Sequence, residues 1–174
     1  MCRVSTPSDR IALIGVGASA LVSRLVETGY RNIDAIDLSA NALEQLRLRL
    51  TAQFETSDVG VRFVESDVLE VEFDEPVDLW HDRATFHFLI DESDQIAYVA
   101  SASRSVRSGG HLILAGFSAT GPQQCSGLDV ARHTPDSIDR LFAGSFGLVD
   151  RFDETHTTPW GAEQSFMYSL FRRV

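Results

Sequence analysis

Three polar residues, His81, Asp82 and Arg83, follow one another directly after the apolar segment VDLW. Such groups at the end of a buried strand are costly to bury unless they are paired or used. We therefore predict a functional site at this strand end, with a pairing of Asp82 and Arg83 as the purely structural alternative. Trp80 alternates with Leu79 and is predicted to lie in the core.

His87 lies four residues after Arg83, and this spacing would place the two side chains on one face of a helix. One hypothesis is that His87 contacts the substrate. The alternative is a histidine packed among the aromatic neighbours of the segment FHF.

The long connection SATGPQQCSGLDVARH contains further candidates for substrate contact. Long irregular segments at the ligand end of a fold are often functional lids. Its candidates are Cys125, Arg132 and His133, and the alternative is a surface loop with ordinary turn chemistry. His156 and Trp160, in the turn predicted between the last two strands, are candidates for the rim of the same site.

Three turns combine residues suited to a nucleotide-like ligand. Gly15 and Gly17 in GVGASA permit close backbone approach, and this stretch also fits the dinucleotide pattern G-x-G-x-x-G/A. Asp37 follows about twenty residues later, where a carboxylate can accept both ribose hydroxyls. Asp67 in ESDV can accept a hydrogen bond from an adenine amino group, while the backbone N–H of Val68 serves a ring nitrogen. The plain alternatives are a strand-to-helix turn, a helix-capping aspartate and a locally bonded turn aspartate.

The elements that must position these residues alternate between strand and helix. Short apolar runs predict strands at residues 11–16, 32–37, 61–66, 77–81 and 111–117. Helical spacing of apolar residues predicts helices at residues 18–28, behind an N-cap at Ser39, and at about 94–106 and 135–143. This alternation indicates a parallel sheet covered on both faces.

The last two segments, FGLVDRFDETH and EQSFMYSLFRRV, predict an antiparallel hairpin at one edge of the sheet. The fold class is therefore α/β, a doubly wound, seven-stranded, mostly parallel sheet with a C-terminal hairpin. In such sheets ligands bind beyond the carboxyl ends of the strands.

The length of 174 residues predicts a single domain over residues 1–174, with residues 1–9 flexible. The chain contains no long apolar run and no signal-peptide pattern, so we expect no membrane partner and a cytoplasmic location. The net charge of −10 disfavours nucleic acid as a partner. Cys2, Cys125 and the scattered histidines lack the spacing of a disulfide framework or a metal site.

The motifs GVGAS, AIDLS, ESDV and DLWHDRATFHFL, in this order, resemble those of class I S-adenosylmethionine-dependent methyltransferases. More narrowly, WHDRATFHFL, GPQQCSGLDVARH and the tail HTTPWGAEQSFMYSLFRR resemble a group of small bacterial methyltransferases. The resemblance runs from about Arg10 to the end of the chain. It implies a Rossmann-like methyltransferase fold and methyl transfer from S-adenosylmethionine, with S-adenosylhomocysteine as product, to a small molecule or a protein side chain.

The resemblance also implies roles for particular residues. The glycine turn, including Ser19, lies under the methionine and ribose part of the cofactor. Asp37 holds the ribose hydroxyls, and the end of the fourth strand lies beside the sulfonium. The adenine ring is contacted by Leu38, Asp67 and Val68. The catalytic candidates are His81, Asp82 and Arg83, because an oxygen or amine acceptor needs alignment and can need a base.

Two departures from the family pattern leave several outcomes open. Leu13 stands where the family usually has an acid, and the first strand begins by Ile11, without the N-terminal segment that commonly covers the cofactor. The pocket is therefore expected to be open, completed by a partner subunit as in a homodimer, or no longer catalytic.

The sequence is also compatible with a non-catalytic cofactor-binding protein and with an NAD-dependent oxidoreductase, because GVGASA with Asp37 fits the dinucleotide fingerprint as well. The oxidoreductase hypothesis leaves ESDV unexplained. The sequence also lacks the lysine of the Tyr-x-x-x-Lys pair that this hypothesis would need.

Overall fold

The computed structural model describes residues 4–54, 59–158, 161 and 163–174. The helices are α1 (Leu21–Glu27), α2 (Ala40–Phe54), the short 3-10 helix η1 (Phe86–Phe88), α3 (Glu92–Ser105) and α4 (Pro135–Phe142). The strands are β1 (Ile11–Ile14), β2 (Ile33–Asp37), β3 (Val61–Glu65), β4 (Val77–Arg83), β5 (Val106–Phe117), β6 (Gln124–Cys125), β7 (Leu128–Asp129), β8 (Phe146–Thr157) and β9 (Glu163–Arg173).

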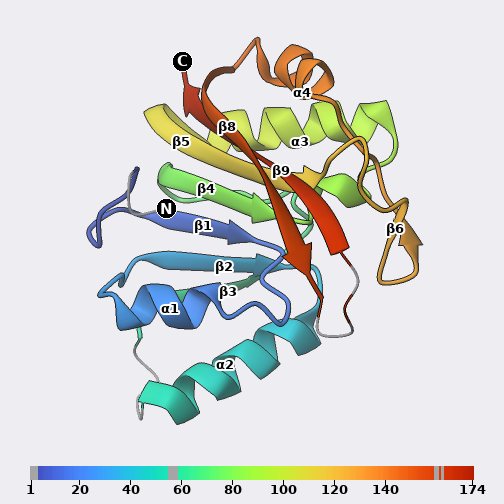
Figure 1. Ribbon diagram of the computed structural model, residues 1–174. Coiled ribbons are helices and arrows are strands. Elements are labelled where there is room, and N and C mark those ends of the chain that lie inside the picture. The colour runs from blue at the N-terminus through green and yellow to red at the C-terminus, as the bar shows by residue number, and fades with distance from the viewer. Residues whose placement is uncertain (1–3, 55–58, 159–160, 162) are drawn as a thin grey trace.

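The described strands form a seven-stranded main sheet in the order β3-β2-β1-β4-β5-β9-β8 (Figure 1). Strands β1 to β5 run parallel, whereas β9 is antiparallel to both β5 and β8. This confirms the predicted doubly wound sheet with a C-terminal hairpin. The small antiparallel pair β6-β7 lies in the connection after β5 and was not predicted.

Two layers of helices cover the sheet. Leucines of α2 at positions 43, 46 and 50 pack with α1 and with Leu13 and Leu79 on one face. Trp80, Tyr98 and Phe142 lie in the core on the other face, under α3 and α4. Because neighbouring residues of a strand point to opposite faces, Leu79 and Trp80 belong to different cores. Trp80 is therefore a core residue, as predicted.

Helix α2 begins where its N-cap was predicted, with the Ala42 N–H donating to Ser39 Oγ at 3.2 Å. The boundary between α3 and β5 differs from the prediction. β5 begins at Val106 rather than at His111, and its pairing register with β4 shifts between Val77 and Leu79. The residues between the predicted helix and the predicted strand therefore lie within β5.

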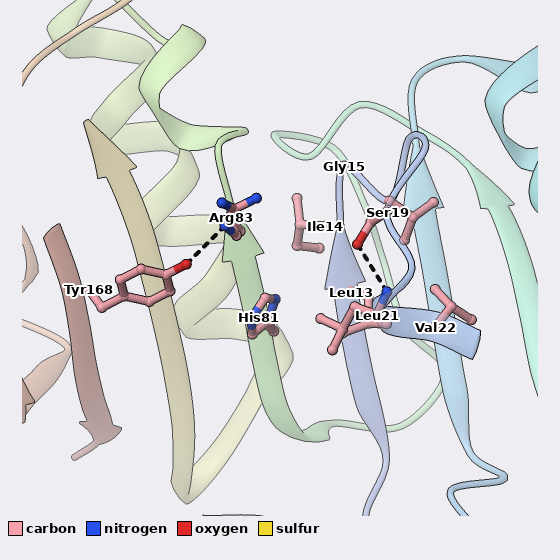
Figure 2. Close-up of a pocket in the computed structure, with 10 residues that line it drawn as sticks. Leu13, Ile14, Gly15, Ser19, Leu21, Val22, His81, Arg83 and Tyr168 are labelled. Atoms are coloured by element: carbon pink, nitrogen blue, oxygen red, sulfur yellow. Dashed lines mark hydrogen bonds between the residues drawn. The ribbon is translucent and has the colours of Figure 1, made fainter. Parts of the chain in front are cut away.

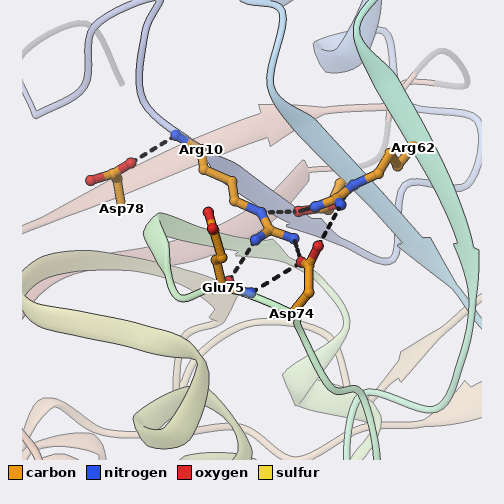
Figure 3. A network of polar contacts seen from close by, with 6 residues as sticks. Arg10, Arg62, Asp74, Glu75 and Asp78 are labelled. Carbon is orange, nitrogen blue, oxygen red and sulfur yellow. Dashed lines mark hydrogen bonds and ion pairs between the residues drawn. The ribbon is translucent and has the colours of Figure 1, made fainter.

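A network of hydrogen bonds between arginines and aspartates connects the amino ends of β1, β2 and β3 (Figure 3). Arg10, just before β1, donates to Asp34 Oδ2 at 2.9 Å and to Asp74 Oδ1 at 2.6 Å. Arg62 donates to the other oxygen of Asp34 at 2.6 Å. Arg10 and Asp34 are both buried, and each neutralises the charge of the other, which would be costly to bury alone. This network lies at the end of the sheet opposite the cavities described below.

Residues 4–9 lie against the body of the protein: Ser5 Oγ is 3.0 Å from Tyr30 Oη, and the Thr6 N–H donates to Asp9 Oδ2 at 2.7 Å. Within the described part of the chain, no helix has the length and apolar character needed to cross a membrane.

Candidate active site

Asp37 and Asp67 line one cavity of about 410 Å³ at the carboxyl ends of the strands. We call it the Asp37 cavity. Apolar side chains make most of its wall, including Ile14, Ile36, Val68, Phe88 and Leu89. Leu38 also lines it and is 72% exposed, which leaves an apolar surface for a ligand to cover. The structure thus brings together the ends of β1, β2 and β3 around a common hollow.

Asp37 is fixed by backbone hydrogen bonds from two directions. Its Oδ2 accepts from the Gly17 N–H at 2.8 Å, and its Oδ1 accepts from the Ser39 N–H at 2.9 Å. A carboxylate has about four acceptor sites, so both oxygens keep capacity for further donors. The carboxylate is therefore held in place with room to accept hydroxyl groups.

Asp67 and Val68 are anchored by local contacts. Asp67 Oδ1 accepts from the Leu69 N–H at 2.9 Å, as the alternative of a turn aspartate predicted. The Val68 carbonyl accepts from Ser101 Oγ at 2.8 Å, which fixes its peptide plane. Since Asp67 also lines the Asp37 cavity, the turn bond and a ligand contact are compatible.

Gly15 of the glycine turn packs closely against Thr85, which follows β4. Gly15 has φ +62°, and a methyl group there would collide with the Thr85 hydroxyl. At Gly17, with φ +42°, a methyl group would meet nothing closer than the Gly15 carbonyl at 3.9 Å. The close approach predicted for Gly15 is thus made by Thr85, which also lines the Asp37 cavity.

A second cavity of about 290 Å³ lies beside the first and shares Ile14 and Gly15 with it (Figure 2). We call it the His81 cavity, because His81 and Arg83 project into it from β4. Leu13, Leu21 and Val22 give it apolar walls; the rest of its lining comes from Val16, Ser19 and Tyr168.

A third cavity of about 570 Å³, the Phe152 cavity, shares His81 and Tyr168 with the second. Val4, Ile113 and Leu170 give it apolar walls, and Asp150 supplies a carboxylate. Phe152 and Tyr168 stack in it with ring centroids 4.9 Å apart and an interplanar angle of 4°. The three cavities therefore follow one another, with His81 between the second and the third.

His81 is uncharged at neutral pH. Burial lowers the pKa of His81 to about 4, and the positive charge of Arg83 acts in the same direction. A neutral imidazole has a nitrogen that can accept a proton. His81 is therefore an uncharged hydrogen-bonding group at the boundary of two cavities.

Asp82 lies on the opposite face of β4 from His81. It is completely buried and accepts hydrogen bonds from the Thr85 N–H at 2.9 Å, the Phe86 N–H at 3.0 Å and the Tyr98 hydroxyl at 2.7 Å. Burial raises the pKa of Asp82 to about 6. Asp82 thus holds the turn after β4 together, and the structure does not bring it to the cavities that His81 and Arg83 line.

The prediction that Arg83 and His87 share a helix face is wrong. Arg83 ends β4, Ala84 has φ +69°, and the helix that follows contains only Phe86–Phe88. His87 is fully buried against the rings of Phe88 and Phe117, at 4.6 and 4.8 Å between centroids. Neither ring nitrogen of His87 has a hydrogen-bond partner among the described residues. Burial lowers its pKa to about 4. His87 matches the alternative of a histidine packed among aromatic rings.

The candidates in the connection after β5 are dispersed. Cys125 is a partly buried free thiol that packs on the cluster around Phe117. Arg132 donates to the carbonyls of Ala119 and Gly121 at 3.2 and 3.3 Å. These bonds join the end of the connection to its beginning. His133 lies 5.3 Å from Phe86 between ring centroids and lines a separate groove beside α3 and α4.

His156 was predicted in the turn between the last two strands, but it lies within β8, opposite Gln164 of β9. Trp160 lies outside the described residues.

Two aromatic residues of the hairpin were missed in the sequence. Tyr168 and Phe152 come from β9 and β8, which are remote in the sequence from the glycine turn. The alternation in EQSFMYSLFRRV places Phe166, Tyr168 and Leu170 on one face, so the signal was present. The pattern did not predict that this face of β9 would lie close to β4, on the other side of β5.

The residues of the Asp37 cavity fit an adenosine group. A held carboxylate suits the ribose hydroxyls, the exposed Leu38 and the apolar wall suit a flat ring, and Asp67 suits an amino donor.

The comparisons with family models and with curated proteins agree on one family. A family model described as a methyltransferase domain matches residues 13–114, more than half of the 174-residue chain. Among curated proteins, the eEF1A lysine and N-terminal methyltransferase homolog of Drosophila melanogaster is 32% identical over 114 residues. That match covers 62% of this chain, and the chain spans only 16% of the relative's length.

Solved structures share the fold. The N-methyltransferase NodS from Bradyrhizobium japonicum superposes with a TM-score of 0.76 at 18% identity, over 99% of this chain and 91% of that chain. NodS has also been solved with S-adenosylhomocysteine. An S-adenosylmethionine-dependent methyltransferase from Methanosarcina mazei superposes with a TM-score of 0.80 at 14% identity, over 99% of this chain and 96% of that chain.

Proposed function

The chain belongs to the methyltransferase domain family, an S-adenosylmethionine-dependent class of enzymes, and from this premise we propose that it transfers a methyl group to a nitrogen atom of a small molecule or a protein side chain. The observation that carries the proposal is the common cavity of Asp37 and Asp67, continued past Gly15 to His81.

The Asp37 cavity is the proposed site of the cofactor's adenosine group. Asp37 accepts the ribose hydroxyls, Leu38 packs on the adenine ring, and Asp67 with Val68 contacts the edge of the ring. The methionine end lies toward the His81 cavity, beyond Gly15 and near Ser19. When bound, S-adenosylmethionine supplies a methyl group that is already activated for transfer.

The Phe152 cavity is the proposed site of the methyl acceptor. It borders the His81 cavity at His81 and Tyr168, so an acceptor there faces the methionine end of the cofactor. The stacked rings of Phe152 and Tyr168 offer a flat apolar surface, and Asp150 attracts a positively charged amine.

His81 is the residue proposed to orient the methyl acceptor. An ammonium group has no lone pair for methyl transfer, so the amine must react in its neutral form. With a pKa of about 4 His81 is too weak a base to deprotonate an ammonium group, but its neutral ring can accept a hydrogen bond from the amine where acceptor and cofactor meet.

A nitrogen acceptor is also consistent with the names of similar proteins. The curated relative is called a lysine and N-terminal methyltransferase homolog, and NodS is called an N-methyltransferase. These names describe those proteins, and they guide the choice of acceptors for this one.

The test is formation of S-adenosylhomocysteine from S-adenosylmethionine in the presence of primary and secondary amines, with thiols and carboxylates as comparison. We expect turnover with at least one class of amine, and a rate about 10- to 150-fold lower after Asp37→Ala at low cofactor concentration. Binding of NAD in place of S-adenosylmethionine would instead identify an oxidoreductase.

A further inference from the structure

Arg83 is held in a fixed position at the mouth of the His81 cavity. Its Nε–H donates to the Tyr168 hydroxyl at 2.9 Å (Figure 2). Its Cζ lies 4.7 Å from the centroid of the Phe166 ring. The hydrogen bond fixes one edge of the guanidinium, and the ring covers one of its faces. Both anchors come from β9, a strand remote in sequence from β4.

The terminal amino groups of Arg83 remain for a ligand. A guanidinium carries five N–H donors, and Tyr168 takes only the one on Nε. Among the described residues, no carboxylate lies within ion-pair distance of Arg83. Burial and the negative charge of Glu154 raise the pKa of Tyr168, and the charge of Arg83 lowers it.

Among the described residues that line the cavity around Arg83, none carries a carboxylate. Its other lining residues are apolar or neutral, and His81 is uncharged at neutral pH. Leu13 pairs with His81 across β1 and β4 and presents an apolar side chain at the point where an acid would neutralise a cation. A single fixed cation beside apolar walls favours a singly charged anion of matching planar geometry.

We propose that Arg83, clamped by Tyr168 and Phe166, binds a carboxylate group in the His81 cavity. The inference rests on the proposed function and deepens it, because two reactants can supply that carboxylate. One source is the methionine end of the cofactor, and the other is a methyl acceptor that carries a carboxylate. The chemistry at Arg83 is the same for both: two parallel N–H donors meet the two oxygens of one carboxylate.

The experiment compares Arg83→Gln with wild type, using ligands that differ only in the carboxylate. Calorimetry gives the affinity for S-adenosylmethionine and for decarboxylated S-adenosylmethionine. Arg47→Gln is the matched control, because Arg47 pairs with Glu44 on the exposed surface of α2. In a second arm, protein saturated with S-adenosylhomocysteine is titrated with propionate and benzoate, and binding is followed by NMR.

If the cofactor supplies the carboxylate, Arg83→Gln weakens S-adenosylmethionine about 10- to 100-fold and leaves the decarboxylated form unchanged. If the acceptor supplies it, both cofactor affinities stay unchanged, and the variant loses the binding of propionate and benzoate that wild type shows. Tyr168→Phe, which removes the anchor of Nε, should reduce the same affinity several-fold while Arg47→Gln leaves it unchanged.

The inference is overturned if Arg83→Gln changes neither the carboxylate-dependent part of cofactor affinity nor the binding of the small carboxylates. That result leaves the proposed function intact as long as wild type binds the decarboxylated cofactor. The failure of wild type to bind either form of the cofactor would instead remove the proposed function.

Discussion

The carboxylate of Asp37 and the backbone N–H of Gly17 are joined by a hydrogen bond of 2.8 Å, which ties the end of β2 to the turn after β1. The same carboxylate lines the Asp37 cavity. One side chain therefore both shapes the glycine turn and faces the proposed ribose site.

Asp37→Ala is expected to weaken S-adenosylmethionine binding by roughly 1.5–3 kcal/mol, because the ribose hydroxyls lose a charged acceptor. This corresponds to about a 10- to 150-fold rise in Kd, measured by calorimetry. Asp136→Ala, at an exposed position of α4, serves as the control. An unchanged affinity would remove Asp37 from the cofactor site.

His81→Ala is expected to reduce turnover by about 10- to 100-fold, because the acceptor amine loses the hydrogen bond that orients it. Its affinity for S-adenosylmethionine should stay nearly intact. Because burial lowers the pKa of His81 to about 4, the ratio of wild-type to His81→Ala turnover should rise with pH near 4 and stay level through pH 6.5.

His111→Ala is the matched control for His81, because His111 lies on the same sheet nearer the amino end of β4, opposite Leu79. A lower melting temperature with full turnover in the His81 variant would show a structural role instead.

Asp82→Ala is expected to destabilise the fold by at least about 3 kcal/mol, since three buried donors lose their acceptor. Tyr98→Phe removes one of these bonds and also leaves the buried Trp80 indole N–H without its acceptor, so it should cost about 2–4 kcal/mol. Urea unfolding measures both. A loss of turnover without loss of stability in Asp82→Ala would contradict the structural role and return Asp82 to the catalytic group.

His87→Leu is expected to reduce the sensitivity of the fold to acid. Burial lowers the pKa of His87 to about 4, whereas an unfolded histidine titrates near 6.5. Between these values the unfolded chain binds a proton that the folded protein does not, so His87 removes about 3 kcal/mol of stability as pH falls from 6.5 to 4.

The comparison of wild type with His87→Leu isolates this contribution. Asp82, whose raised pKa acts in the opposite direction, and His81 are present in both proteins. The free energy of unfolding, measured against pH, should fall less steeply for the variant below pH 6.5. Parallel curves would show that His87 does not titrate in this way.

The common cavity of Asp37 and Asp67 was the most predictable part of the proposed site. Asp37 and Asp67 each end a short apolar strand, and parallel strands bring their carboxyl ends to one edge of the sheet. Two residues far apart in the sequence could therefore be assigned to one cavity from strand pattern alone. Nothing in that inference required knowledge of side-chain packing.

The part of the site after β4 was less predictable. The spacing of Arg83 and His87 suggested one helix face, but Ala84 takes a positive φ and turns the chain. Asp82 then accepts the backbone N–H groups of the turn, a role that its residue type alone did not distinguish from catalysis. Tyr168 was missed because strand order, rather than sequence, brings β9 close to β4 across β5.

The most direct measurement is a crystal structure of the protein with S-adenosylhomocysteine. The expected result is a ribose whose hydroxyls donate to Asp37, an adenine ring between Leu38 and Phe88 with its edge at Asp67, and a sulfur atom facing His81. A ligand bound elsewhere, or a ribose turned away from Asp37, would contradict the account.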